Sequence, residues 1–427
     1  MDDYNQQFSE QQSYDMHEIS NPGPPKKQKS RFGLGFLVGA LVGAAVILIG
    51  VVVYSFVTYR QMVDIYNGDA KFEYLSYQEK VETILEYLDL YYFGEVDEEK
   101  IGDGLSDGIL SGIDDKYAKY YTKEEFDRLL EDSSGEYCGI GVSITQEESG
   151  EIVVYKVFKG TPAEEAGIHA QDVIVEADGE RGFADLDALV AIVRGEEGTT
   201  VDLVILRDGE EIPMTVERRI IITPSVESKM LDDNIGYIAI SEFDRATVTQ
   251  FNDAITELEG QGMEALVIDL RDNPGGDYDS VVAMADRVLP EGTIITTKNK
   301  KGTVKEEISD EEHQLTIPMA LLVNANTASA AELFSGAIQD YGLGYIVGTQ
   351  TYGKGVVQSI YRLSDGSGMK FTTEKYYTPS GRCVDGEGVI PDYDVELPDE
   401  VYEDGIVTED EDVQLQKAIE LLEGDLE

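Results

Sequence analysis

A long apolar run near the start of the chain places the strongest limit on its architecture. Residues 34–57 read LGFLVGALVGAAVILIGVVVYSFV and contain no charged side chain. About 20 apolar residues span the hydrocarbon core of a bilayer, so this run predicts a transmembrane helix. A helix buried in a soluble domain is the weaker interpretation at this length. A cleavable signal peptide would have a shorter apolar stretch, of about 7–15 residues, so we expect an uncleaved anchor.

The charges beside the apolar run predict which side of the membrane the rest of the chain occupies. A basic cluster at residues 26–31 precedes the run, whereas the chain beyond it is mostly acidic. An excess of Lys and Arg marks the cytoplasmic flank of a membrane helix. We therefore expect residues 1–33 to be a disordered cytoplasmic tail and residues 58–74 to be a stalk. All later domains are expected to lie outside the cytoplasm at the cell membrane.

The composition excludes several classes of function. The chain has 33 basic and 85 acidic residues and a formal charge of −52, and so negative a surface repels nucleic-acid phosphates. Three widely separated histidines and two cysteines do not supply the ligand spacing of a zinc site. We therefore expect no nucleic-acid partner and no histidine-based metal catalysis. A disulfide between Cys138 and Cys383 is chemically allowed outside the cytoplasm, and the sequence leaves it open.

Three kinds of sequence pattern divide the external part of the chain. Apolar residues at helical spacing predict a helical region over residues 75–134. Short β-branched runs between glycine turns predict a β domain over residues 135–212. Buried-type strands alternate with helical patterns over residues 213–400, which predicts an α/β core, and residues 401–427 are expected to form an acidic tail ending in a helix. In the α/β core we expect strands at 236–240, 265–270, 319–323 and 345–347, and helices at 246–259, 278–288 and 331–339.

The first chemical motif is a glycine turn at the start of the β domain. Residues 139–142 read Gly-Ile-Gly-Val, and such a turn lets successive backbone N–H groups converge on an anion. A peptide's terminal carboxylate can bind there while the peptide adds to the sheet as a strand. An ordinary glycine turn is the alternative. The predicted carboxylate-binding residues are Gly139, Ile140, Gly141 and Val142.

The context of this turn resembles a known binding module. Residues 159–168 read KGTPAEEAGI and are followed by Asp172 and by an Asp-Gly turn at 178–179. This pattern resembles the PDZ domains of bacterial membrane-associated proteases. Ala170-Gln171 stands where such domains usually carry Gly-Asp, a departure that we expect to change only the turn geometry. Arg194, a charge in an otherwise apolar stretch, is a candidate sensor of PDZ occupation, with an ordinary surface arginine as the alternative.

Two further motifs follow predicted strands of the α/β core. The strand at 265–270 runs into Arg-Asp-Asn-Pro-Gly-Gly, where the backbone N–H of Gly275 is a candidate donor to an oxyanion. The strand at 319–323 leads through small residues to Ser329 at a predicted helix N-terminus, where partial positive charge favours a nearby anion. A plain turn and a serine that only caps its helix are the alternatives.

The last motif is a lysine between glycines. Lys354 precedes a β-branched run, and Gln358 is four positions further on. On a strand an even separation puts both side chains on one face, so Gln358 is expected to orient the Lys354 amine. Desolvation lowers the pKa of a lysine and yields a neutral amine that can accept a proton. A solvated lysine in a glycine hairpin is the alternative.

In this order, Pro-Gly-Gly, Ala-Ser-Ala-Ala-Glu and Tyr-Gly-Lys-Gly-x-x-Gln resemble the carboxy-terminal processing serine proteases of peptidase family S41. The resemblance implies that Ser329 is the nucleophile, Lys354 its general base and Gln358 the residue that positions the lysine. It also implies an oxyanion hole made by the backbone N–H groups of Gly275 and Ala330, with no metal or cofactor. Thr327 and Ala331 stand where the family often has serines; the chemistry requires neither.

The same resemblance implies the fold and the partners. Family members have a cap-and-core protease domain related to the crotonase fold with an inserted PDZ domain, and many dimerise through terminal helices. We therefore expect a homodimer formed through residues 75–130 and 410–427, and polypeptide substrates with free C-termini. Two alternatives stay open: a PDZ scaffold on an inactive protease fold, and an unrelated Ser/Lys hydrolase, which would lack the internal PDZ-like unit. Peptides with free and amidated C-termini distinguish these possibilities.

Overall fold

The structure is a computed structural model that describes residue 43 and residues 45–60, 76–147, 149–310, 314–398, 409 and 411–426. The chain divides into two units, Met1–Val96 and Asp97–Glu427. The expected cytoplasmic tail lies outside the described residues. So does the expected stalk, except for residues 58–60, which are helical.

The Met1–Val96 unit contains helix over residues 45–60 and helix α2 (Tyr77–Tyr91). Ser76 and Glu79 cap α2 reciprocally, because the N–H of Ser76 donates to the Glu79 carboxylate at 2.8 Å and the N–H of Glu79 donates to the Ser76 hydroxyl at 3.3 Å. No helix in the described residues is long and apolar enough to cross a membrane. The span expected at residues 34–57 lies partly outside those residues.

The Asp97–Glu427 unit is built on a mostly parallel six-stranded sheet. Only the edge pair β10/β11 is antiparallel among the neighbours in this sheet. Central strands β12 and β15 are buried along their whole lengths, as expected when both faces of a parallel sheet are covered. The strand order is β10 (Val226–Met230), β11 (Ile235–Ile240), β12 (Ala265–Asp269), β15 (Met319–Val323), β16 (Gly344–Gly348) and β19 (Tyr393–Asp394).

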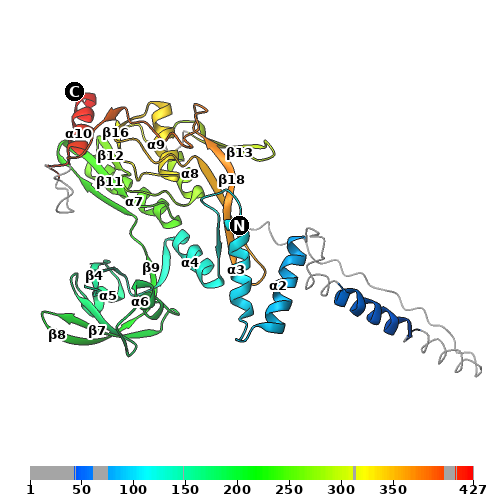
Figure 1. The fold of residues 1–427 in the computed structure, drawn as a ribbon. Coiled ribbons are helices and arrows are strands. Elements are labelled where there is room, and N and C mark those ends of the chain that lie inside the picture. The colour runs from blue at the N-terminus through cyan, green and yellow to red at the C-terminus, as the bar shows by residue number, and fades with distance from the viewer. Residues whose placement is uncertain are drawn as a thin grey trace, which may run out of the picture. The chain divides into compact units, whose positions relative to one another are not determined.

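Alternate residues of the central strands pack into different cores. Leu266 and Ile268 of β12 join the core formed with helices α7 (Arg245–Gln261), α8 (Tyr278–Asp286) and α9 (Ala330–Tyr341). Ala265 and Val267 join the core formed with α10 (Val413–Leu426) on the other face. Figure 1 shows these helices around the sheet. The predicted α/β core is confirmed, and the C-terminal helix is a packed part of it.

A second sheet of the same unit brings the N-terminal segment to the core. β1 (Lys119–Tyr121), which lies between α3 (Glu98–Ser111) and α4 (Lys123–Ser134), pairs with β18 (Gly368–Tyr377). The order of this sheet is β1, β18, β13 (Gly292–Asn299) and β14 (Val304–Ser309), and β17 (Val356–Arg362) also pairs with β18.

The predicted β domain is inserted between two adjacent strands. β2 (Glu136–Gly139) enters it and β9 (Arg219–Ile222) leaves it, and these two strands pair antiparallel. Gln171 takes a positive φ of 74° in the turn where this sequence lacks the glycine that PDZ domains usually carry. Cys138 and Cys383 are both free thiols, so they form no disulfide in this structure. The sheet of the domain is ordered β3 (Val142–Gln146), β4 (Ile152–Val157), β5 (Val173–Ala177), β7 (Thr200–Arg207) and β8 (Glu210–Glu217), with β6 (Glu180–Arg181) beside β5 and helices α5 (Pro162–Ala166) and α6 (Leu186–Val193).

Candidate active site

The residues predicted to carry the chemistry line one cavity of about 460 Å³ in the Asp97–Glu427 unit. They come from turns and strands that are far apart in the sequence but meet beside the N-terminus of α9. The structure thus brings together all the residues predicted for the nucleophile, the base, the residue that positions the base and the oxyanion hole: Gly275, Ser329, Ala330, Lys354 and Gln358.

Ser329 occupies a strained position at the start of α9. It is the N-cap residue and has φ 55° and ψ −115°, an unusual conformation for a residue with a side chain. The Tyr376 hydroxyl donates to the Ser329 carbonyl oxygen at 3.0 Å. The backbone N–H of Ser329 donates to the Glu332 carboxylate at 2.8 Å. These two contacts hold the turn that presents the hydroxyl at the positive end of the helix.

Glu332 is a residue of the site to which our motif analysis gave no role. Its side chain is fully buried, and its carboxylate accepts the N–H groups of Gly353 and Lys354, each at 2.7 Å, and the Thr351 hydroxyl at 2.5 Å. Together with the N–H of Ser329, these bonds join the serine turn directly to the lysine loop. The sequence signal was an acidic residue three positions after the helix-capping serine, the spacing of a capping box.

Lys354 is half-buried and its amine is accordingly easier to deprotonate. Burial lowers the pKa of Lys354, the positive charges of Lys370 and Lys116 lower it further, and the Glu332 carboxylate opposes them. A lowered pKa increases the fraction of neutral amine, the form that accepts a proton. Among the described residues no hydrogen bond joins this amine to the Ser329 hydroxyl, although both groups line the same cavity.

Gln358 lines the same cavity as Lys354, and among the described residues no hydrogen bond joins the two side chains. Its side-chain amide donates to the carbonyl oxygen of Val356 at 3.3 Å. Lys354 precedes β17, and a β-bulge between Val357 and Gln358 interrupts the alternation of that strand. The expectation from even spacing therefore does not apply to this pair, because alternation holds only along a regular strand. The role of Gln358 stays a prediction.

Gly275 lies against the nucleophile. A Cβ atom at this position would lie 2.7 Å from the Ala328 carbonyl oxygen and 2.7 Å from Ser329 Cβ, and the backbone has a φ of 99°. Only glycine fits both requirements. The N–H of Gly275, however, donates to Asn273 Oδ1 at 2.8 Å, and Asn273 is fully buried. One of the two predicted oxyanion donors is therefore engaged inside the protein in this structure.

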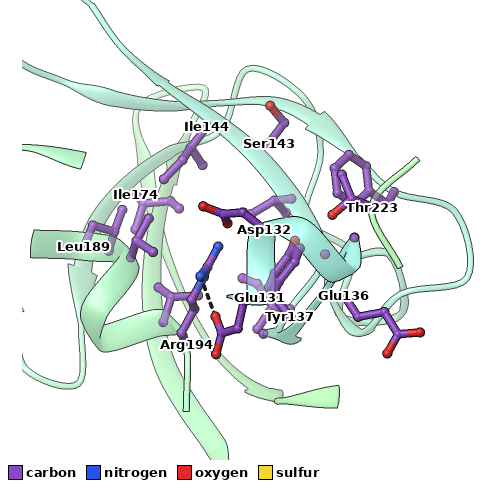
Figure 2. A pocket seen from close by; sticks show the side chains of 18 of the residues that line it. Glu131, Asp132, Glu136, Tyr137, Ser143, Ile144, Ile174, Leu189, Arg194 and Thr223 are labelled. Atoms are coloured by element: carbon purple, nitrogen blue, oxygen red, sulfur yellow. Dashed lines mark hydrogen bonds and ion pairs between the residues drawn. The ribbon is translucent and has the colours of Figure 1, made fainter. Parts of the chain in front are cut away.

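The predicted carboxylate-binding turn lines a separate cavity of about 390 Å³ (Figure 2). The carbonyl oxygens of Ile140 and Gly141 accept the N–H groups of Ala163 and Phe158, at 2.9 and 3.0 Å, which fixes the turn. Apolar side chains of β3, β5 and α6 form the wall beside it: Ile144, Ile174 and Leu189. The four predicted residues, Gly139, Ile140, Gly141 and Val142, all line this cavity.

Arg194 lies at the edge of the same cavity and is paired. Its guanidinium donates to the Glu131 carboxylate of α4 at 2.8 Å, the dashed contact in Figure 2. The guanidinium also lies 4.9 Å from the ring centroid of Tyr137. Asp132, the next residue of α4, lines both this cavity and the one that contains Ser329. Helix α4 is thus a wall common to the two cavities.

Comparison with known proteins shows which families the chain resembles. Residues 234–395 match peptidase family S41, and residues 138–217 match the PDZ domain. A protein of Staphylococcus aureus (strain COL), "Probable CtpA-like serine protease", is 34% identical over 367 residues, which cover 84% of this chain and 72% of that protein. A protein of the same name from Staphylococcus saprophyticus is 34% identical over 78% of this chain and 67% of its own length.

Among solved structures, a photosystem II D1 C-terminal processing protease is similar, with 28% identity and a TM-score of 0.45 over 74% of this chain and 88% of that chain. The sequence relationship to the protein of Staphylococcus aureus spans most of both chains, and the two matched families cover Ser329, Lys354 and the glycine turn at 139–142. This chain therefore belongs to peptidase family S41 and is a serine peptidase that carries a PDZ domain.

Proposed function

We propose that this peptidase is a membrane-anchored endopeptidase that cuts extracytoplasmic proteins near their C-termini. The observation that carries the catalytic part is the single cavity lined by Ser329, Lys354 and Gly275, in which one buried carboxylate, that of Glu332, joins the serine turn to the lysine loop. A PDZ-type cavity in the same unit offers a place for the substrate's terminus.

In the proposed mechanism Lys354 acts as the general base. Its neutral amine takes the proton of the Ser329 hydroxyl as the oxygen attacks a peptide carbonyl carbon, and gives that proton to the leaving nitrogen as the C–N bond of the tetrahedral adduct breaks. Water then hydrolyses the resulting acyl-enzyme. The lowered pKa of Lys354 favours the neutral form that this step needs. The N–H groups of Gly275 and Ala330 would stabilise the oxyanion, which requires Gly275 to release Asn273.

Recognition of a free C-terminus would take place at the PDZ-type cavity. Backbone N–H groups at residues 139–142 would meet the carboxylate, and the peptide would add beside β3. Arg194 is the proposed sensor, because its bond to Glu131 links the PDZ domain to α4 and α4 also borders the catalytic cavity. If peptide binding breaks the bond between Arg194 and Glu131, a movement of α4 would change the catalytic cavity.

The anchor and the location are proposed from the sequence. The apolar run at residues 34–57 is long enough to span a bilayer, and the basic cluster at 26–31 lies on the flank expected to be cytoplasmic. Such an anchor would leave the catalytic part outside the cytoplasm. Protease accessibility of the PDZ domain in intact cells, compared with lysed cells, tests the orientation, and digestion only after lysis would contradict it.

The homodimer is proposed from exposed apolar surface in the Met1–Val96 unit. Helix α2 has no buried residue, and Ile84, Leu85 and Tyr91 are exposed there. Apolar helical faces of this kind are usually covered by a partner. Sedimentation of the detergent-solubilised protein would reveal the dimer, and replacing Leu85 with Glu should shift it to monomer.

A cleavage assay with matched substrates tests the catalytic proposal. The full-length protein in detergent is incubated with one peptide bearing either a free or an amidated C-terminus. We expect wild type to cut the free acid faster, and Ser329→Ala and Lys354→Ala to cut neither. Binding of the free acid without cutting by wild type would instead support a PDZ scaffold. Equal cutting of both peptides would exclude recognition of the terminal carboxylate.

A further inference from the structure

The loop between α3 and β1 places an aromatic ring against the candidate base. The Nζ atom of Lys354 lies 4.9 Å from the ring centroid of Tyr117. The Nζ atom of Lys116 lies 4.7 Å from the centroid of the same ring. Aromatic faces attract ammonium groups within about 6 Å. Lys354 therefore has an aromatic neighbour from the N-terminal part of this unit, which none of the sequence motifs identified.

The position of Tyr117 is fixed by hydrogen bonds to the sheet that supports the cavity. The Asp115 carboxylate accepts the N–H of Tyr117 at 3.0 Å and the N–H of Thr372 in β18 at 2.7 Å. Burial acts to raise the pKa of Asp115, but the hydrogen bonds from Thr372 and Tyr117 outweigh it and the pKa is lowered. The carboxylate is therefore charged at neutral pH. β18 also carries Tyr376, which holds the Ser329 carbonyl.

A second contact fastens the same loop to the segment that carries the lysine. The Lys116 ammonium donates to the Tyr352 hydroxyl at 3.4 Å and lies 5.1 Å from that ring's centroid. The hydroxyl oxygen of Tyr117 itself is buried, and no hydrogen bond joins it to Lys354 in the described part of the chain. What Tyr117 offers Lys354 is therefore the face of its ring, not a hydrogen bond.

We propose that Tyr117 is a positioning residue for Lys354: its ring keeps water from the amine and presents its face to the ammonium that forms when Lys354 takes the Ser329 proton. This inference rests on the proposed function, in which Lys354 is the general base. The proton passes from Ser329 Oγ to Lys354 Nζ as Oγ bonds to the carbonyl carbon. The ring stabilises the resulting ammonium in a site where water does not.

The ring has two effects of opposite sign on the lysine. Excluding water lowers the pKa of Lys354, whereas the aromatic face favours its ammonium form and raises the pKa. Replacing Tyr117 leaves the neighbouring charges in place, so a series of variants at this position separates the two effects. The charged groups that act on the Lys354 amine are Lys370 of β18, Lys116 of the loop and Glu332 of α9. Asp132, Glu242 and Asp277 line the same cavity, as do the hydroxyl-bearing Tyr278 and Tyr376.

The experiment measures kcat and KM against pH for the full-length protein in detergent, with a peptide bearing a free C-terminus. Tyr117→Phe keeps the ring and should reproduce the wild-type profile. Tyr117→Leu still covers the amine but has no aromatic face, so we expect kcat to fall about three- to tenfold without a shift of the acidic limb to higher pH. Tyr117→Ala admits water, so its acidic limb should move to higher pH and its activity at neutral pH should fall further.

Tyr155→Ala is the matched control, because this tyrosine is an exposed residue of β4 and should leave the profile unchanged. The proposal is overturned if Tyr117→Leu retains wild-type kcat, or if Tyr117→Phe is as impaired as Tyr117→Ala. If Tyr117→Ala does not fold, judged by its thermal unfolding, the Phe and Leu variants still decide. Activity in Lys354→Ala would instead refute Lys354 as the base. If Lys354→Ala is inactive but all the Tyr117 variants keep the wild-type kcat and pH profile, the role of Tyr117 is refuted and the role of Lys354 as the base is not.

Discussion

The two cavities of the Asp97–Glu427 unit are built in different ways. The PDZ-type cavity is lined mainly by one stretch of chain between Gly135 and Arg194. The catalytic cavity gathers Gly275, Ser329 and Lys354 from separate segments, and buried side chains hold these segments together. A local site tolerates the loss of one contact, because its own backbone keeps its shape. A distributed site depends on the few groups that join its parts.

The largest effect is expected where the segments of the catalytic cavity approach most closely. Gly275→Ala would place a Cβ atom 2.7 Å from the Ala328 carbonyl oxygen and from Ser329 Cβ. We expect kcat to fall by at least about 10²–10³-fold, the loss seen when an oxyanion donor is removed. Gly260→Ala in α7 is the control, because a Cβ there meets nothing within 4 Å. More than a tenth of wild-type kcat in Gly275→Ala would contradict this geometry.

Glu332→Gln tests whether one carboxylate holds the catalytic cavity together. Glutamine keeps the shape, but its NH2 group cannot accept the N–H groups that both carboxylate oxygens now accept. We expect the free energy of unfolding to fall by about 3 kcal/mol and kcat by about 10²-fold, because buried donors lose a charged acceptor.

Chemical denaturation and steady-state kinetics measure the two quantities for Glu332→Gln. Glu420→Gln, which removes the charge of an exposed pair with Lys417, should change stability by less than about 0.5 kcal/mol. Equal behaviour of the two variants would show that the distributed site does not depend on Glu332.

A smaller effect is expected at the PDZ-type cavity. Arg194→Gln breaks the bond to Glu131 but leaves the glycine turn in place. We expect the ratio of kcat for the free-acid peptide to kcat for the amidated peptide to fall about three- to tenfold, because the charged contact that peptide binding would break is already absent. Arg181→Gln, which breaks the ion pair with Glu211 away from the cavity, is the control. A wild-type ratio of the two kcat values in Arg194→Gln would contradict the role of Arg194 as the sensor.

The smallest effect is expected from the charges around the base. Lys370 lowers the pKa of Lys354 because the two charges repel. In Lys370→Gln the pKa of Lys354 rises, so less amine is neutral at a given pH and the acidic limb of the rate profile moves to higher pH. We expect a loss of about two- to threefold at neutral pH that disappears at alkaline pH, since repulsion from a single neighbouring charge is modest at the effective dielectric constant of a protein site. A shift of the limb to lower pH would contradict the assigned sign.

Patterns within one segment predicted much of this structure. The strand Met319–Val323 was predicted with its observed bounds, and burial on both faces of the parallel sheet explains its uninterrupted apolar sequence. The motifs also selected the residues that line the catalytic cavity, because each motif is a strand or turn that delivers one side chain to the same place.

The contacts between segments were not predictable in this way. The β-bulge beside Gln358 depends on how β17 pairs with β18, and the ring of Tyr117 reaches Lys354 only after β1 has paired with β18. The hydrogen bond from Gly275 to Asn273 joins residues that are only two positions apart. It depends on a side-chain rotamer, which the hydrophobic periodicity of the sequence does not encode.

The bond between the Gly275 N–H and Asn273 bears on how inhibitors of this peptidase should be chosen. A boronic acid or another compound that mimics the tetrahedral adduct carries an anionic oxygen, and it gains its full affinity only after that N–H has turned toward it. Such a compound should bind slowly, with a rate set by the rearrangement. An alkylating reagent that needs only an exposed hydroxyl has no such requirement. Comparing the two classes would measure how often the donor is released in the resting enzyme.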